Sequence, residues 1–297
     1  MPISPFKLIC YTSLALIALA GNSVLCRLAL GNHIIDAASF TVIRLLSGIA
    51  VLAFILFINK GLNFSQVSPE NSLTVTHKKS TGSWLASLML FIYAITFSYA
   101  YLSLDTGTGA LILFGAVQIS MIMMGLLSGN KLHYSEWLGI GTAFIGLIYL
   151  VMPTLSTPSV TGFILMAISG IAWAIYSLLG RSSTNPIDDT AYNFLRTLPF
   201  IVILAFFTFE QVAITPKGLW LAIISGAITS GIGYVIWYIA LRGLSVTQAA
   251  VIQLSVPILA SLGGILFVNE LVSLRFIISS GLVLGGILIV VTGRYFY

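Results

Sequence analysis

The side chains of this sequence best suited to binding a ligand are polar or aromatic residues set within long apolar runs. Pro257 is the clearest, because a proline within a helix leaves the carbonyl four residues earlier, that of Gln253, without its usual hydrogen bond. Where lipid replaces water, such a carbonyl must find another partner or line a cavity. Gln253 and Gln118 also place amide side chains within their runs. The structural alternatives are a packed kink or a hydrogen bond between helices; we favour a cavity at Pro257 and leave Gln118 open.

Three further residues extend this candidate cavity. Asn22 lies late in the first apolar run, where a polar side chain serves equally as a ligand contact or as a hydrogen bond between helices. Trp173 and Tyr176 share a later run, and the position of Trp173 near its middle favours the cavity. Aromatic residues near the ends of runs instead favour the membrane interface, and these are Tyr99, Trp237 and Tyr238. The candidate binding residues are therefore Asn22, Gln118, Trp173, Tyr176, Gln253 and Pro257.

Arg44 and Arg196 are the basic residues that fall clearly within apolar runs. An ionisable group inside a membrane is costly to bury and is a functional candidate by default. Asp36 and Asp188 each lie eight residues earlier, which is about 12 Å along a helix and too far for a direct pair. We expect a structural or gating role for the two arginines, with direct anion binding as the alternative.

The sequence lacks the motifs of common catalytic sites. It has no His-Glu-x-x-His pattern, no glycine-rich phosphate loop and no Ser, His and Asp set in matching runs. Its two cysteines, Cys10 and Cys26, lie in one apolar run, and its three scattered histidines do not form a metal-ligand pattern. We therefore expect no enzyme activity, no cofactor and no metal.

The composition is that of a membrane protein. Of the 297 residues, 58% are hydrophobic and only 7% are charged, whereas a soluble domain carries about 25% charged residues. The net charge of +5 is spread over short connections, so we expect a lipid bilayer and not a nucleic acid as the partner. The first apolar run lacks a small-residue cleavage site, and we expect it to be retained as a helix.

Ten apolar runs are long enough to cross a bilayer as helices, since a span needs about 20 residues. They are 8–27, 36–58, 83–104, 107–128, 135–153, 159–180, 190–209, 217–241, 246–268 and 273–293. Positive charges set their orientation, because Lys and Arg accumulate on the cytoplasmic side. The side that holds the N-terminus carries eight of them: Lys7, Lys60, Lys78, Lys79, Lys131, Arg181, Arg242 and Arg294. The other side carries Arg27, Lys217 and Arg275. We expect an all-α protein of the cytoplasmic membrane with both termini in the cytoplasm.

One stretch of the sequence occurs twice. Residues 99–151 align with residues 238–290 at an offset of 139 without a gap, with 13 identities in 53 positions. A looser match at an offset of 152 pairs residues 35–44 with residues 187–196. Each half, 1–153 and 159–297, then holds five spans, and an odd number inserts the second copy upside down. Inverted repeats of this kind are a recurrent architecture of secondary transporters, with the substrate near the midplane between the repeats.

Several segments together resemble the drug/metabolite transporter superfamily, specifically its EamA-type members. They are residues 36–44, 193–196, 249–257 and 269–271 and the glycine-rich last run. The resemblance implies ten helices, cytoplasmic termini, a central cavity and export of small metabolites. Residues 172–177 are similar to a stretch of aromatic amino-acid exporters in this family. The chain departs from the family at Gln118, which aligns with Pro257 where the family often has proline in both halves, so we expect a lopsided site.

We interpret the sequence as a secondary transporter that exports a small metabolite, such as an amino acid, by alternating access. The alternative is a membrane scaffold or sensor that transports nothing. A Gly-x-x-x-Gly pair, Gly281 and Gly285, suits close helix packing. We favour packing within one chain, with a homodimer as the alternative.

The predicted orientation can be measured with reporter fusions. Green fluorescent protein fused after Tyr297 should fluoresce, because that end is expected in the cytoplasm, and alkaline phosphatase fused there should be inactive. Alkaline phosphatase inserted after residue 213, on the opposite side, should be active. The reverse pattern would contradict the orientation.

Overall fold

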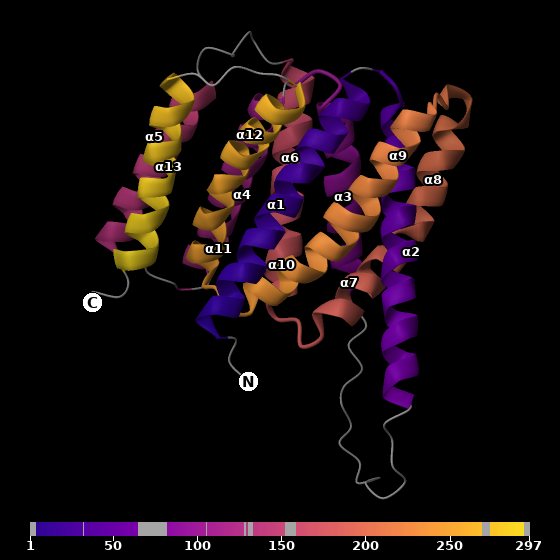
Figure 1. Ribbon diagram of the computed structural model, residues 1–297, viewed down its shortest axis with the longest axis horizontal. Helices are drawn as coiled ribbons and strands as arrows, with labels where there is room; N and C mark the ends of the chain where they lie inside the picture. The colour runs from indigo at the N-terminus through magenta and orange to yellow at the C-terminus, as the bar shows by residue number, and fades with distance from the viewer. Residues whose placement is uncertain are drawn as a thin grey trace, which may run out of the picture.

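The computed structural model describes residues 4–31, 33–64, 82–104, 106–127, 129, 133–151, 159–268 and 274–293. Within these residues the fold is all helical, and the long helices run side by side (Figure 1). The expected all-α class is confirmed. Lys78, Lys79, Lys131 and Arg294, which were counted for the orientation, and residues 269–271, which contribute to the family resemblance, lie outside the described residues.

The first half of the chain forms helices whose bounds lie within a few residues of the apolar runs. They are α1 (Pro5–Leu30), α2 (Ala37–Phe64), α3 (Trp84–Ala100), α4 (Thr106–Leu127) and α5 (Tyr134–Val151). The second half is more interrupted. It forms α6 (Val160–Arg181), α7 (Pro186–Leu195), α8 (Leu198–Thr208), η1 (Phe209–Gln211), α9 (Pro216–Ile224), η2 (Ser225–Ile232), α10 (Gly233–Leu241), α11 (Val246–Ile252), η3 (Gln253–Ser255), α12 (Val256–Val268) and α13 (Leu274–Gly293).

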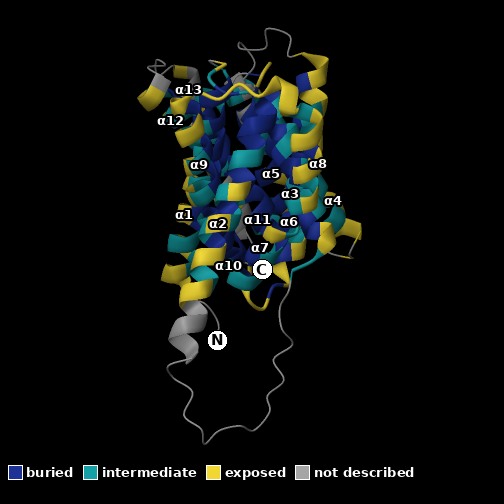
Figure 2. Ribbon diagram, turned by 90° about the vertical axis from the view of Figure 1, so that its right-hand side faces the viewer, coloured by how far each residue is buried: buried dark blue, intermediate teal, exposed yellow. Residues whose placement is uncertain are grey.

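Seven helical stretches among the described residues are long and apolar enough to cross a membrane, and α3 and residues 277–286 are shorter apolar helices. The outer faces of the bundle are exposed and the inner faces are buried (Figure 2). Large apolar side chains are exposed on the outside, among them Phe57, Phe207 and Leu266. Lipid is the solvent that makes such a surface stable, so the protein crosses the membrane several times. The count of ten spans stays a prediction.

Side-chain caps fix where several helices begin, because the first N–H groups of a helix have no partner within it. The hydroxyls of Ser83, Ser159 and Thr215 accept hydrogen bonds from backbone N–H groups in the first turns of α3, α6 and α9. Ser245 and Gln248 cap each other reciprocally at the start of α11. The ends of these spans are therefore encoded locally.

Two spans of the second half are not regular helices. The run 190–209 was expected as one helix, but it breaks between α7 and α8, because Pro199 has no N–H to donate to the carbonyl of Leu195. There the Thr197 hydroxyl donates to the Phe194 carbonyl at 2.6 Å. The span of α9 and α10 contains a π-helix, η2, in which each backbone hydrogen bond joins residues five positions apart. Such wide turns are frequent at functional sites.

The helix contacts come in matched pairs between the halves. α3 packs along α6 as α10 packs along α1, and α4 packs on α6 as α12 packs on α1. Likewise α2 contacts α3 as α7 contacts α10, and α5 lies along α13 (Figure 1). Exchanging the helices of the first half with those of the second half leaves this set of contacts unchanged.

The Gly-x-x-x-Gly pair does not pack as expected within the chain. Among the described atoms, none would lie within 4 Å of a Cβ at Gly281 or Gly285. The contact between α5 and α13 uses Gly146 and Gly286 instead, which face backbone and side-chain atoms of the opposite helix. Gly281 and Gly285 lie on a different face of α13 from Gly286, so the expected packing of this pair within the chain is not found among the described residues.

Gly226 allows η2 to approach α2 so closely that a Cβ there would overlap the Arg44 carbonyl oxygen and the Ser47 hydroxyl. Gly226→Ala should therefore destabilise the protein by about 1–3 kcal/mol, since backbone must move to relieve the clash. Gly141→Ala is the matched control, because Gly141 has no described atom nearby. Thermal unfolding in detergent measures both; an unchanged midpoint for Gly226→Ala would contradict the close approach.

Candidate functional site

Arg44 of α2 is buried inside the bundle and joins three elements. Its Nε donates to the Ser230 hydroxyl of η2 at 2.9 Å. Its Nη2 donates to the Tyr234 hydroxyl of α10 at 2.7 Å and to the Tyr93 hydroxyl of α3 at 3.2 Å. The guanidinium carbon also lies 5.3 Å and 5.2 Å from the ring centres of Tyr93 and Phe97, within the range of cation–π attraction. The charge is thus surrounded by hydroxyls and aromatic faces.

Asn22 of α1 completes this polar network from the other side. Its Oδ1 accepts hydrogen bonds from the hydroxyls of Ser225, Thr229 and Ser230 at 2.9, 2.6 and 3.2 Å. Its Nδ2 donates to the Thr229 carbonyl at 3.3 Å and to the Tyr234 hydroxyl at 3.2 Å. Protein groups thus use both amide donors and the carbonyl oxygen of Asn22. Asn22 ties α1 to the π-helix, and its role in binding stays a prediction.

Trp173 of α6 and Gln253 of η3 are in direct contact. The Trp173 Nε1 donates to the Gln253 Oε1 at 2.7 Å, and the Gln253 Nε2 donates to the Ala249 carbonyl at 3.0 Å. The effect of Pro257 differs from the expected one: the Gln253 carbonyl accepts the N–H of Val256. A short 3-10 turn therefore supplies a hydrogen bond to the Gln253 carbonyl, which Pro257 cannot bond. This carbonyl is not an unpaired group in a cavity.

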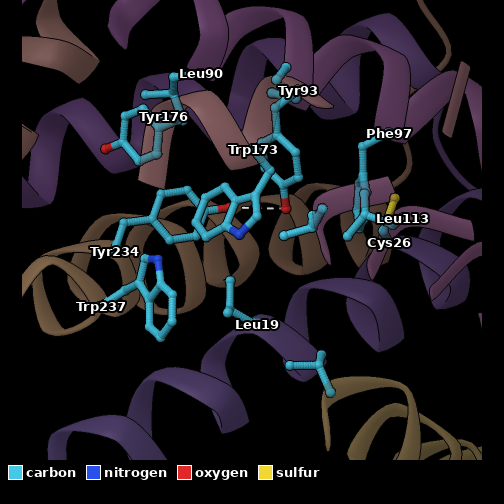
Figure 3. Packing of buried hydrophobic residues seen from close by; sticks show 14 of the residues in the cluster. Leu19, Cys26, Leu90, Tyr93, Phe97, Leu113, Trp173, Tyr176, Tyr234 and Trp237 are labelled. Carbon is cyan, nitrogen blue, oxygen red and sulfur yellow. Dashed lines mark hydrogen bonds between the residues drawn. The ribbon is translucent and has the colours of Figure 1, made fainter. Parts of the chain in front are cut away.

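Aromatic side chains from α3, α6 and α10 meet inside the bundle (Figure 3), and two of them, Tyr93 and Tyr234, contact Arg44. The Trp173 ring centre lies 4.7 Å from that of Tyr234 and 5.0 Å from that of Tyr93. Tyr176 lies 5.6 Å from Trp173, and Tyr238 lies 5.0 Å from Tyr176. These rings form a continuous aromatic cluster between the polar network and one end of the bundle.

Two pockets open at opposite ends of the bundle. One, of about 200 Å³, is lined by Ser83 just before α3, by Asp189 and Asn193 of α7, and by Tyr238. The other, of about 280 Å³, is lined by Asp36 and Ala37 at the start of α2 and by Tyr99 and Leu102 at the end of α3. Because α3 begins at the first pocket and ends at the second, the length of that helix separates them.

Comparison with known proteins places this arrangement in a family. The sequence profile of the EamA-like transporter family matches residues 160–292. A protein of Pseudomonas aeruginosa that is itself uncharacterised is 44% identical over 283 residues, which cover 95% of this chain and 94% of that protein. The chain belongs to the EamA-like transporter family. It is thereby a member of the drug/metabolite transporter superfamily, as its sequence motifs indicated.

More distant relatives agree. An uncharacterised transporter of Archaeoglobus fulgidus is 28% identical over 68% of this chain and 74% of its own length. The uncharacterised transporter YoaV of Bacillus subtilis is 22% identical over 86% of this chain and 88% of its own length. A solved crystal structure superposes with a TM-score of 0.67 at 18% identity over 94% of this chain and 97% of that one, which shows a shared fold. Family and relatives support a membrane transporter.

Several buried polar atoms of this EamA-type chain have no hydrogen-bond partner among the described residues. Both amide atoms of Gln118, the Nη1 of Arg44 and the hydroxyls of Tyr176 and Thr190 are among them. Leaving a buried polar group unpaired costs about 1–3 kcal/mol. Among the described residues, Gln118 forms no hydrogen bond to another helix, so the structural alternative for Gln118 has no support. Buried polar atoms without a partner are suited to binding a ligand.

The two arginines of the repeat have different surroundings. Arg196 ends α7 half-buried, with its guanidinium carbon 5.5 Å from the ring centre of Trp84, a side chain that is 58% exposed. Arg44 lies in the bundle interior. Asp36 does not pair with Arg44, because its carboxylate accepts the N–H groups of Ser39 and Ala213 at 2.8 and 2.9 Å.

The expectation that Trp237 and Tyr238 form part of an interfacial belt was wrong. They are 0% and 1% exposed, and they donate hydrogen bonds to the Ser177 hydroxyl and the Tyr176 carbonyl, each at 3.0 Å. With Tyr234 they occupy positions i, i+3 and i+4, which share one helix face. That spacing was the available signal that all three point inward.

Two substitutions should distinguish, by their effect on stability, a polar side chain that is hydrogen-bonded within the protein from one that is not. Asn22→Ala removes an acceptor of the buried Ser225 and Ser230 hydroxyls and should lower the free energy of unfolding by about 1–3 kcal/mol. Gln118→Leu removes amide atoms that have no partner in the described structure, and it should leave stability unchanged or raise it. Thermal unfolding in detergent compares them. A larger loss for Gln118→Leu than for Asn22→Ala would contradict the assignment.

Proposed function

We propose that the protein is a secondary transporter of the cytoplasmic membrane that exports a small metabolite, such as an amino acid, by alternating access. The observation that carries the proposal is the pair of pockets at opposite ends of the bundle, with a buried polar and aromatic centre between them. A carrier needs one central site that is reached in turn from either side.

The two pockets are lined by equivalent parts of the repeat. Tyr99 and Tyr238 match at the offset of 139, and each lines one pocket. The rest of each lining includes the beginning of α2 or of α7, which match at the offset of 152. This correspondence, with the matched helix contacts, supports two inverted halves that provide one entrance each.

The two entrances are closed to different extents. Tyr238 is buried, and its hydroxyl donates to the Tyr176 carbonyl, so it separates its pocket from the ring of Tyr176. Tyr99 is only half-buried. We infer that Tyr238 is the side chain that must move for its pocket to reach the aromatic cluster.

The alternative, a scaffold or sensor that transports nothing, is supported less well. A scaffold would be expected to have a dry, fully satisfied centre. Among the described residues, the amide of Gln118 and the Nη1 of Arg44 are buried without a hydrogen-bond partner, which a static assembly would retain only at a cost in stability. Unpaired polar atoms in the interior are expected of a site that takes up a polar solute.

The proposal can be tested by untargeted metabolite profiling of cells and medium after overexpression. At least one small metabolite should rise in the medium and fall in the cells. Trp173→Ala and Gln253→Ala should each reduce that flux several-fold, because each removes one partner of the contact between α6 and η3. Phe207→Ala, at an exposed outer position, is the matched control and should retain the flux.

Membrane levels and thermal unfolding of each variant must be measured alongside. If no metabolite responds to overexpression, the scaffold or sensor is favoured over the transporter. If a flux appears that neither central substitution changes, the carrier stands and the assigned cavity is wrong.

A further inference from the structure

The guanidinium of Arg44 has more donors than the protein accepts. Arginine carries five N–H donors and no acceptor. One, on Nε, is given to Ser230, and the two on Nη2 are given to Tyr93 and Tyr234. Nη1 is buried, and among the described residues it has no partner. Two N–H donors of a buried cation therefore point to no protein acceptor.

The surrounding network cannot supply an acceptor. The Tyr234 hydroxyl accepts from Arg44 and Asn22 and donates to Tyr93, which lies 3.2 Å away. The Tyr93 hydroxyl accepts from Arg44 and Tyr234, and no acceptor among the described residues takes its own hydrogen. If the bond between the tyrosines ran the other way, the spare hydrogen would belong to Tyr234. In either case, one tyrosine hydroxyl and the two N–H groups of Arg44 Nη1 have no acceptor among the described residues.

The charge of Arg44 is not neutralised by the described carboxylates. Asp36, Glu136, Asp188 and Asp189 lie at or near the beginnings of helices, and Glu210 follows α8. Four of them accept hydrogen bonds near their own helix ends: Asp36 from Ser39, Glu136 from His133, Asp188 from Asn185 and Asp189 from Gly82. A buried charge without a counter-ion is costly.

We propose that Arg44, through Nη1, together with the spare hydroxyl of the Tyr93 and Tyr234 pair, binds the carboxylate of a small molecule that has an apolar body. The inference rests on the transport function proposed above and names the substrate class. An ionised carboxylate only accepts hydrogen bonds and carries one negative charge. It therefore complements a site that has only donors left and one positive charge.

The neighbouring surfaces fit the rest of such a molecule. Tyr93 and Tyr234, which accept hydrogen bonds from the guanidinium, form an aromatic cluster with Trp173 (Figure 3). Aromatic faces accept apolar and planar groups, and because they carry partial negative charge they do not stabilise a second negative charge. A phosphate ester, with close to two negative charges at neutral pH, would leave a net negative charge among these rings. The surroundings thus favour a monocarboxylate.

A purely structural role for Arg44 explains only part of its contacts. Bonds from Nε and Nη2 would join α2, α3 and the π-helix in the same way if Nη1 were absent. The two unused donors distinguish a binding site from a structural link, and they determine the test.

The test measures thermal unfolding of the purified full chain in detergent with matched probes at millimolar concentration. The pairs are phenylacetate with phenylacetamide, phenylalanine with phenylalaninamide, and leucine with leucinamide. At least one carboxylate should raise the unfolding midpoint by several degrees, while its amide should not, because only the carboxylate supplies the missing anion. Stabilisation by phenylalanine but not by leucine would assign an aromatic body.

Variants locate the binding. Arg44→Met should abolish the shift, and Arg44→Lys, which retains the charge without the planar donor geometry, should weaken it and covers the case in which Arg44→Met does not fold. Tyr93→Phe should raise the dissociation constant about three- to tenfold, as expected for one lost hydrogen bond. Arg196→Gln is the matched control, because it changes the equivalent arginine of the other half, and it should retain the shift.

The outcomes separate this inference from the proposed transport. The inference is overturned if no carboxylate stabilises the wild-type chain, if amides stabilise it equally, or if Arg44→Lys binds with unchanged affinity. A carboxylate that binds at Arg44 but does not cross proteoliposome membranes would refute transport and leave the site standing. A profiled flux of a molecule without a carboxylate would leave transport standing and refute the site.

Discussion

A guanidinium buried in a bundle whose outside faces lipid must have its charge and its donors satisfied from within. Arg44 draws hydroxyls from α3, η2 and α10 toward α2, and Asn22 brings α1 to the same hydroxyl groups. Gly226 permits the approach, because no side chain fits between η2 and the Arg44 carbonyl. Much of the packing between the halves therefore follows from one residue that lipid cannot solvate.

The order and ends of the helices could be predicted from the sequence, because apolar run length and Ser or Thr caps are local properties. The irregular segments could not. Pro199 was present in the sequence, but whether a proline bends a helix or divides it depends on what its neighbours donate, as Thr197 does here. Within the π-helix, the Thr229 carbonyl accepts a hydrogen bond from Asn22, which lies more than two hundred residues away in the sequence, so no local pattern indicates this contact.

The candidate site was predicted in part. Trp173 and Gln253, selected for their depth, are in contact, whereas Tyr93, Ser225 and Ser230 were not selected. Serines and a tyrosine in an apolar run are common and carry little signal alone; they become a site only when the fold brings a cation among them. The inward face of α10 was misread because nearness to a run end was weighed above the spacing of Tyr234, Trp237 and Tyr238.

The π-helix has a consequence for comparison among relatives. A helical wheel assumes a constant angle per residue, and η2 interrupts that phase between α9 and α10. A helical wheel that treats residues 216–241 as one continuous α-helix would place Trp237 and Tyr238 on the wrong face relative to α9. Alignments of this span should therefore be phased separately on each side of residues 225–232, and a relative with one residue fewer there would be expected to have a regular α-helix.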